Sequence, residues 1–185
     1  MRLLPLLALV AACAGAPKDG PRGLDRVTLL GADGPHAARD LVREAPLTAI
    51  VFFSAHCACQ AAHDARLVAL IERFAGRVRF VLVDSEVDAA PEREAREAER
   101  RGYKTAPMID RGGELARAFG VEVATFAVVL DQGGRVQYAG GIDSDRVHLT
   151  DDATPYLADA LEDLLAGRAP RVRTAKALGC ALRTS

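Results

Sequence analysis

The sequence predicts one α/β domain with a central mixed β-sheet and helices on both of its faces. Three observations support this prediction. Short apolar runs alternate with segments of helical periodicity, as expected for strand–helix–strand units. Residues 49–53 are continuously apolar, which is typical of a strand buried on both faces. Two later apolar runs flank the turn sequence at 131–134, which predicts an antiparallel hairpin at one edge of the sheet.

The predicted elements begin with the half of the chain that surrounds the buried strand. We expect a short strand at 26–30, a short helix at 37–43, the buried strand at 49–53, a helix at 58–75 and a strand at 78–83. The 58–75 helix has a clear apolar face, because Leu67, Leu70, Ile71 and Phe74 follow the i, i+3, i+4, i+7 spacing. Gly76 then ends it.

The second half continues the same alternation. We expect a charged surface helix at 91–101, a short helix at 114–119, hairpin strands at 125–130 and 135–138, and a last helix at 154–167. Pro91 suits the first position of a helix, and Gly102 a stop. The last helix carries leucines on one face and ends at Gly167. The sequence therefore predicts a domain over 24–167, followed by a tail at 168–185.

Composition excludes several classes of protein. The chain has 185 residues, of which 50% are hydrophobic and 26% charged, with a formal net charge of −1. That is enough apolar material for one core. The balanced charge gives no basic field for nucleic acid. Four cysteines are too few for a disulfide-dense miniprotein.

The N-terminal segment reads as a targeting signal. One arginine precedes a ten-residue apolar run, which is too short to span a membrane, and small residues follow it. The end of this 1–13 segment resembles the lipobox of bacterial lipoproteins, which implies lipidation of Cys13. Cleavage after Ala16, or no processing, are the alternatives. We expect an exported protein of the cell envelope that faces the periplasm and contacts the membrane only through this lipid, with 14–23 as a flexible tether.

The cysteines carry the functional signal. If Cys13 is consumed by processing, three remain, and an odd number cannot form a purely structural disulfide set. Cys57 follows the buried strand and lies at or just before the first turn of the predicted helix. Free N–H groups and the helix dipole favour a thiolate there. We therefore expect a lowered pKa and a nucleophilic Cys57, with protonated His56 acting in the same direction.

The strand followed by Phe53-Ser54-Ala55-His56-Cys57-Ala58-Cys59 resembles the redox-active entry of the thioredoxin superfamily, in its redoxin and peroxiredoxin-like branch. The similarity extends through Arg101-Gly102-Tyr103, the 129–136 hairpin and Gly140-Gly141-Ile142-Asp143 to Leu178-Gly179-Cys180. It implies a thioredoxin-like fold and thiol–disulfide exchange without a cofactor. The substrate would be a protein or small-molecule disulfide, and an external dithiol reductant would regenerate the enzyme.

Within this resemblance, Ser54 takes the place of the hydroxyl residue of peroxiredoxins, and Thr125 lies near the cis-proline position of thioredoxins. No proline stands at position 50, so disulfide exchange is favoured over the reduction of a hydroperoxide, which remains an alternative function. The partner of Cys57 stays open between Cys59 and Cys180. Two residues on a regular helix diverge by about 200°, so a Cys57–Cys59 bond needs Cys57 as a cap.

A metal module is a further alternative. Cys59, His63, Leu67 and Leu70 share one stripe of the predicted helix. His63 is either a partly covered core residue, or a proton acceptor or soft-metal ligand beside Cys59. In the last case Cys57, Cys59 and His63 would form a site suited to Cu(I). The aspartates at 143, 145, 151 and 152 lack the pattern of a calcium loop, and we expect them to be solvated.

Overall fold

The computed structural model describes residues 23–184, and the signal and lipobox segment, with nearly all of the tether, lies outside them. The strands are β1 (Thr28–Gly31), β2 (Gly34–Ala37), β3 (Leu47–Phe53), β4 (Arg79–Asp84), β5 (Met108–Ile109), β6 (Phe126–Asp131) and β7 (Val136–Gly141). The α-helices are α1 (Ala38–Arg43), α2 (Ala58–Arg73), α3 (Pro91–Arg100), α4 (Glu114–Phe119) and α5 (Tyr156–Leu165). Short 3₁₀ turns cover Leu24–Arg26 and Arg111–Gly113.

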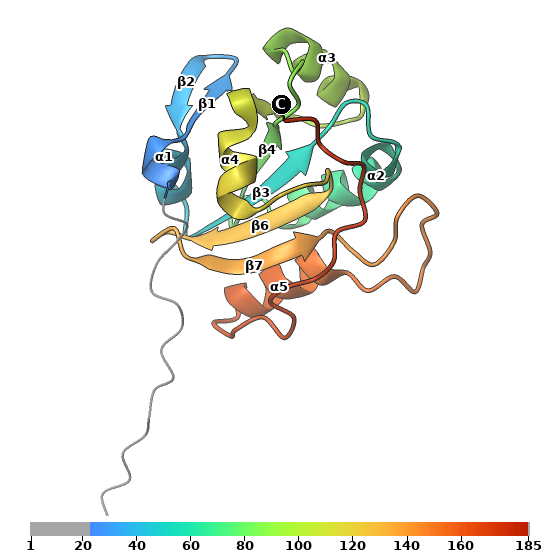
Figure 1. Cartoon of the computed structure of the whole chain (residues 1–185). Coiled ribbons are helices and arrows are strands. Elements are labelled where there is room, and N and C mark those ends of the chain that lie inside the picture. The colour runs from blue at the N-terminus through green and yellow to red at the C-terminus, as the bar shows by residue number, and fades with distance from the viewer. Residues whose placement is uncertain (1–22, 185) are drawn as a thin grey trace, which may run out of the picture.

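One mixed sheet organises the molecule, with strand order β2-β1-β5-β4-β3-β6-β7 (Figure 1). The central strands β3, β4 and β5 run parallel, whereas β6 is antiparallel to β3 and β7 to β6. The predicted hairpin at one edge is confirmed. The prediction missed a second hairpin, β1–β2, at the opposite edge. Residue 37, expected to begin a helix, ends β2 instead, because its backbone is extended.

The buried strand β3 separates two cores. Its alternate side chains Leu47, Ala49, Val51 and Phe53 face one core, which is closed by residues of α2, α3 and α5. The intervening Ile50 and Phe52 face the other, closed by α1 and α4. All seven residues of β3 are buried, as the continuous apolar run predicts. This arrangement fixes the end of β3, and therefore the start of α2, between two packed layers.

The C-terminal segment after α5 is held against the body of the domain. It passes β7, where Ala139 N–H donates to the Arg173 carbonyl at 3.0 Å. It then runs toward the start of α2, where Ala124 N–H donates to the Cys180 carbonyl at 2.9 Å. In Figure 1 this dark-red segment runs upward from α5 alongside the orange strands. Residues 174–184 are called the tail strap below.

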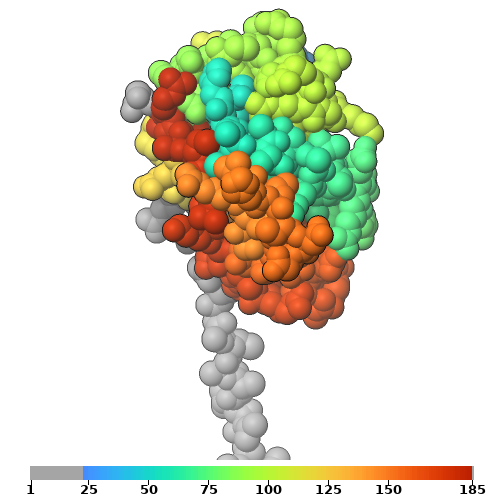
Figure 2. Space-filling model, turned by 90° about the vertical axis from the view of Figure 1, so that its right-hand side faces the viewer, coloured from blue at the N-terminus to red at the C-terminus, as the bar shows by residue number. Residues whose placement is uncertain are grey.

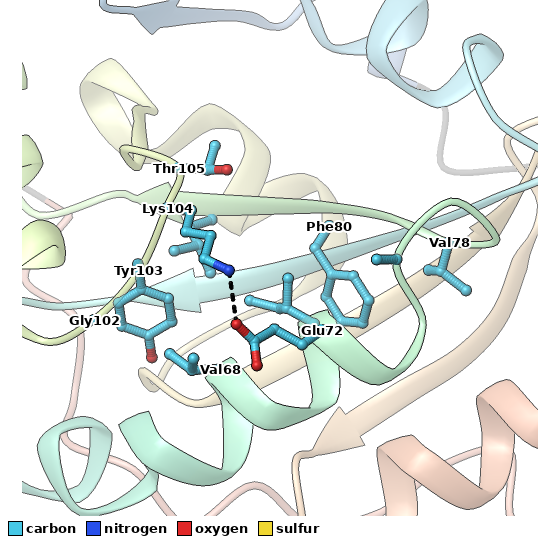
Figure 3. Close-up of a pocket in the computed structure, with 11 residues that line it drawn as sticks. Val68, Glu72, Val78, Phe80, Gly102, Tyr103, Lys104 and Thr105 are labelled. Carbon is cyan, nitrogen blue, oxygen red and sulfur yellow. Dashed lines mark hydrogen bonds and ion pairs between the residues drawn. The ribbon is translucent and has the colours of Figure 1, made fainter.

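No helix among residues 23–184 has the length and apolar character to cross a bilayer. The structure also has an apolar cavity of about 180 Å³ beside the C-terminal half of α2. Figure 3 shows Val68, Phe80 and Tyr103 around it, with an ion pair between Lys104 and Glu72 at its rim. The lining includes no cysteine, so this cavity is separate from the thiols described next.

Candidate active site: a cluster of three thiols

Cys57 caps helix α2 through its own sulfur. Its backbone is extended, and its Sγ accepts the N–H of Gln60 at 3.3 Å, as a serine or aspartate does at other helix starts. Cys57 therefore stands outside the regular helix, which is the position that a Cys57–Cys59 bond would need. The cap fixes the sulfur over the first turn of α2, where helix N–H groups have no partner within the helix.

Cys180 completes the cluster from the tail strap. Its backbone N–H donates to Cys57 Sγ at 3.3 Å across 123 positions of sequence. The sulfurs of Cys57, Cys59 and Cys180 all lie within 4.8 Å of one another, and none is bonded to another. The structure thus brings together all three cysteines that the sequence singled out in this part of the chain.

The three thiols differ in access to solvent. Cys57 and Cys59 are 1% and 3% exposed and pack with Ala124, whereas Cys180 is half-buried. Cys180 and Leu182 pack against the two buried thiols, so the tail strap forms part of their cover. Figure 2 shows the red atoms of the C-terminal segment at the surface beside the cyan atoms of the segment that follows β3.

The expected lowering of the Cys57 pKa is wrong for this arrangement. Burial and the neighbouring Cys180 thiol raise the pKa of Cys57 to about 11, although the N–H groups of Gln60 and Cys180 act against them. For Cys180, burial also opposes ionisation. The Cys57 and Cys59 thiols and the backbone amides of Cys59 and Ala58 outweigh it, so the pKa of Cys180 is lowered. The helix start therefore favours a thiolate on the cysteine that comes from the tail.

His63 does not join the thiols. Its Nδ1 pairs with the Cys59 carbonyl at 2.7 Å, and its Nε2 with Asp143 at 3.0 Å, in a side chain only 2% exposed. Burial opposes the imidazolium, but the hydrogen bonds to Asp143 and Cys59 outweigh it and raise the pKa of His63. A ring with both nitrogens engaged neither takes a proton from a thiol nor binds a metal beside one. The predicted set Cys57, Cys59 and His63 is therefore corrected.

Of the four aspartates expected to be solvated, Asp151 and Asp152 are exposed, but Asp143 and Asp145 are held in ion pairs. Asp143 is buried, and Arg66 donates to both carboxylates at 2.8 Å. Asp143 thereby links α2 to the loop after β7. The calcium-loop pattern was rejected on sequence grounds, and these ion pairs give the carboxylates a structural role instead.

Ser54, His56 and Thr125 surround the cluster without touching a sulfur in the described hydrogen-bond network. Ser54 Oγ donates to Glu86 at 3.1 Å and accepts the N–H of His56 at 3.3 Å. The exposed His56 side chain lines a surface hollow with arginines of α3. Thr125 precedes β6 with φ of 67°, and its N–H donates to the Phe52 carbonyl at 2.9 Å. No cis peptide occurs between residues 23 and 184.

Sequence reasoning missed the residues that hold the site in place. Glu86 accepts both Ser54 Oγ and the Arg183 guanidinium, the latter at 3.0 Å, and so ties the tail strap to the end of β3. Arg101 donates to the Ala55 carbonyl and packs over the Phe53 ring, which fixes the loop before Cys57. The Arg101-Gly102-Tyr103 motif belongs to the family resemblance, but the residues that Arg101 contacts, Phe53 and Ala55, are distant from it in sequence.

Neither a protein-family model nor a curated protein matches this chain. Solved structures do. An uncharacterised conserved protein of Geobacillus kaustophilus is 24% identical, with a TM-score of 0.74 over 85% of this chain and 86% of its own. A thioredoxin-like protein of Aeropyrum pernix is 18% identical, with a TM-score of 0.52 over 65% and 82%.

A third match is a secreted disulfide oxidoreductase of Mycobacterium tuberculosis, described as homologous to E. coli DsbE. It is 16% identical, with a TM-score of 0.51 over 61% of this chain and 81% of its own. Together with the mixed sheet, these similarities define the class: the chain has an α/β, thioredoxin-like fold. In this molecule the fold carries a cluster of three thiols, one of them on the C-terminal strap.

Proposed function

We propose that the protein is an exported thiol–disulfide oxidoreductase whose redox pair is Cys57 and Cys180. One observation carries the proposal: a cysteine 123 positions away lies with its sulfur within 4.8 Å of the sulfur that caps α2. The fold is shared with a secreted disulfide oxidoreductase, which supports both the reaction and export. The signal and lipobox segment at 1–13 supports export and lipid anchoring independently.

Cys180 is the thiol that meets the substrate, because it is the accessible member of the cluster. Its thiolate attacks one sulfur of a disulfide R–S–S–R. The substrate S–S bond breaks, a mixed disulfide forms on Cys180, and one thiolate leaves. The sulfur of Cys57 then attacks Cys180, and its proton passes to the second leaving thiolate. The first leaving thiolate takes from solvent the proton that Cys180 released when it ionised, so two substrate thiols and one Cys57–Cys180 disulfide result. An external dithiol protein then reduces this disulfide and is itself oxidised.

The reaction order differs from the one expected from the sequence, in which Cys57 attacks first. The change follows from burial, because a sulfur that is 1% exposed cannot approach a disulfide in solution while the tail strap is in place. The sulfur of Cys59 also lies within reach of Cys57. The experiment must therefore distinguish Cys59 from Cys180 as the disulfide partner of Cys57. Reduction of a hydroperoxide requires the same thiolate and is tested in parallel.

The test is the turnover of glutathione disulfide by the full chain and by Cys57→Ser, Cys59→Ser and Cys180→Ser, with mass spectrometric mapping of the oxidised protein. We expect a Cys57–Cys180 bond, loss of turnover in Cys57→Ser and Cys180→Ser, and turnover within about threefold of the starting protein in Cys59→Ser. A Cys57–Cys59 bond with an active Cys180→Ser variant would overturn the assignment of the pair. Thiol-dependent consumption of hydrogen peroxide, without disulfide turnover, would assign the peroxidase function instead.

A further inference from the structure

The same three sulfurs have the arrangement of a ligand set. We infer that reduced Cys57, Cys59 and Cys180 bind one thiophilic metal ion in threefold coordination, with Cu(I) as the ion best matched to the site. This inference does not depend on disulfide exchange, because it concerns the reduced protein alone. It replaces the site containing His63 that the helical stripe predicted.

Distance is the first argument. Three sulfurs around one ion, with metal–sulfur bonds of about 2.3 Å, lie about 4 Å from one another in a plane. All three sulfur–sulfur distances here are within 4.8 Å, so small side-chain rotations suffice to close the set. The donors also come from a fixed frame, because Cys57 and Cys59 sit at the start of α2. Cys180 is anchored by the backbone pairing of Ala124 with its carbonyl.

The number and type of donors select the ion. Among residues 23–184 the cluster comprises three ligands, all of them sulfur. Two histidines lie near these cysteines in sequence. The His56 side chain is exposed and lines the hollow beside α3, and that of His63 is held by Asp143 and the Cys59 carbonyl. Zinc in structural sites takes four ligands in a tetrahedron, whereas soft thiolates without further donors suit Cu(I). The site therefore favours a three-coordinate soft cation over zinc.

Charge and second-sphere contacts point the same way. Thiolates that are nearly fully buried are costly unless positive charge or N–H groups face them. The N–H groups of Gln60 and Cys180 both point at Cys57 Sγ, and a bound cation supplies the remaining compensation. On binding, the ion displaces the protons of the thiols into solution.

Binding would also join two separate segments of the chain. Two ligands belong to α2 and the third to the tail strap, so the ion cross-links the strap to the helix. The Arg183 guanidinium already holds the strap through Glu86 and Asp88 at 3.0 Å each. A metal-loaded strap should therefore open less often than a metal-free one.

The test is an anaerobic titration of the reduced full chain, in a Cys13→Ser background, with Cu(I) supplied from a competing coloured chelator. We expect one Cu(I) per chain and X-ray absorption spectra showing three sulfur neighbours and no imidazole. Cys57→Ser, Cys59→Ser and Cys180→Ser should each weaken binding by at least tenfold, while His63→Gln should stay within about threefold. Zn(II) should bind more weakly than Cu(I).

Several outcomes would overturn the inference: two-coordinate copper, an imidazole neighbour, or unchanged affinity in Cys180→Ser. Because a variant can fail by misfolding, the spectrum of the unmutated protein provides a readout that needs no substitution. Protein oxidised to the Cys57–Cys180 disulfide should bind no Cu(I). If the protein binds no Cu(I) but turns over disulfides, only the metal-site inference is refuted. If it binds Cu(I) but does not turn over disulfides, only the proposed redox function is refuted.

Discussion

At the scale of single residues, burial reverses the roles that position along the chain suggests for the thiols. Cys57 has the helix-start location that lowers a thiol pKa in other settings. Here its sulfur is enclosed, and the enclosure raises its pKa to about 11. The neighbouring Cys57 and Cys59 thiols, with the N–H groups of Cys59 and Ala58, lower the pKa of Cys180, which is more exposed. The N–H groups at the start of the helix thus act on a residue that is remote in sequence as well as on Cys57.

A buried carboxyl near the site gives a pH-dependent prediction. Asp84, at the end of β4, is 1% exposed. Its carboxyl group interacts with that of Glu94, which is fully buried. Burial raises the pKa of Asp84 to about 7, the carboxylates of Glu94 and Glu86 add to it, and the Glu86 N–H partly opposes it. Between the unfolded value of 3.8 and about 7, the folded chain keeps a proton that the unfolded chain loses.

The free energy of unfolding should therefore fall as pH rises from about 4 to about 7. Above pH 7 ionisation of Asp84 should lower it no further. Asp84→Asn should remove the loss, so the variant should be more stable than the starting protein at pH 8, by up to about 4 kcal/mol, and nearly equal at pH 4. Urea unfolding at the two pH values measures this, with the exposed Asp152→Asn as the control. An equal effect of Asp84→Asn at both pH values would contradict the prediction.

At the scale of elements, the tail strap and the segment before β6 form one unit. Ala124 and Cys180, and Glu122 and Leu182, are joined by backbone hydrogen bonds of 2.9 Å. Gly179 allows this close approach, since a Cβ built there would lie 1.8 Å from the Ala124 carbonyl oxygen. The strap therefore docks through backbone contacts that a single methyl group would break.

Gly179→Ala should undock the strap while leaving the two cores intact. Crowding of this kind costs about 1–3 kcal/mol, so alkylation of Cys57 by iodoacetamide should accelerate about tenfold or more. Mass spectrometry of the labelled peptide measures the rate. Lys176→Ala, which shortens an exposed side chain on the same strap, is the matched control and should leave the rate unchanged. If both variants label Cys57 at the starting rate, the strap does not control access.

At the scale of the whole molecule, the site lies where several independent parts meet. The start of α2, the segment before β6 and the C-terminal strap pack together at the thiol cluster. The Thr125 N–H donates to the Phe52 carbonyl and so ties the segment before β6 to the end of β3. Glu86 connects two of these parts, because it contacts both Ser54 and Arg183. The geometry of this cluster, and with it the proposed exchange chemistry, therefore depends on the packing of the whole sheet and not on one motif.

The proposed lipid anchor is tested on the full chain with its N-terminal segment. Expressed with its own N-terminal segment in a Gram-negative host, the protein should incorporate labelled fatty acid and fractionate with membranes. Cys13→Ala should abolish the label and release the chain from the membrane fraction, because the several acyl chains proposed on Cys13 are what would give stable anchoring. Label retained in Cys13→Ala, or a mature N-terminus at residue 17, would contradict lipidation of Cys13.

Much of the fold follows from local patterns, since the continuous apolar run of β3 and the leucine stripe of α5 each depend on neighbours a few residues away. The four-residue strand β2 and the two-residue strand β5 were missed, because so few residues give no periodicity to detect. For the site, the sequence identified the three cysteines but left the partner of Cys57 open, and it placed His63 among the thiols. The Glu86–Arg183 pair has no local signal.

The sequence alone determined the alternation of strands and helices, the position of Cys57 at a helix start, and the presence of a cysteine in the tail. Each of these depends on residues within one or two turns of one another. The tertiary structure decided which thiol is exposed, which N–H groups act on each sulfur, and that His63 binds Asp143 instead of a thiol. Burial and hydrogen bonding are set by whatever packs across a site, and here that is a strap from the far end of the chain.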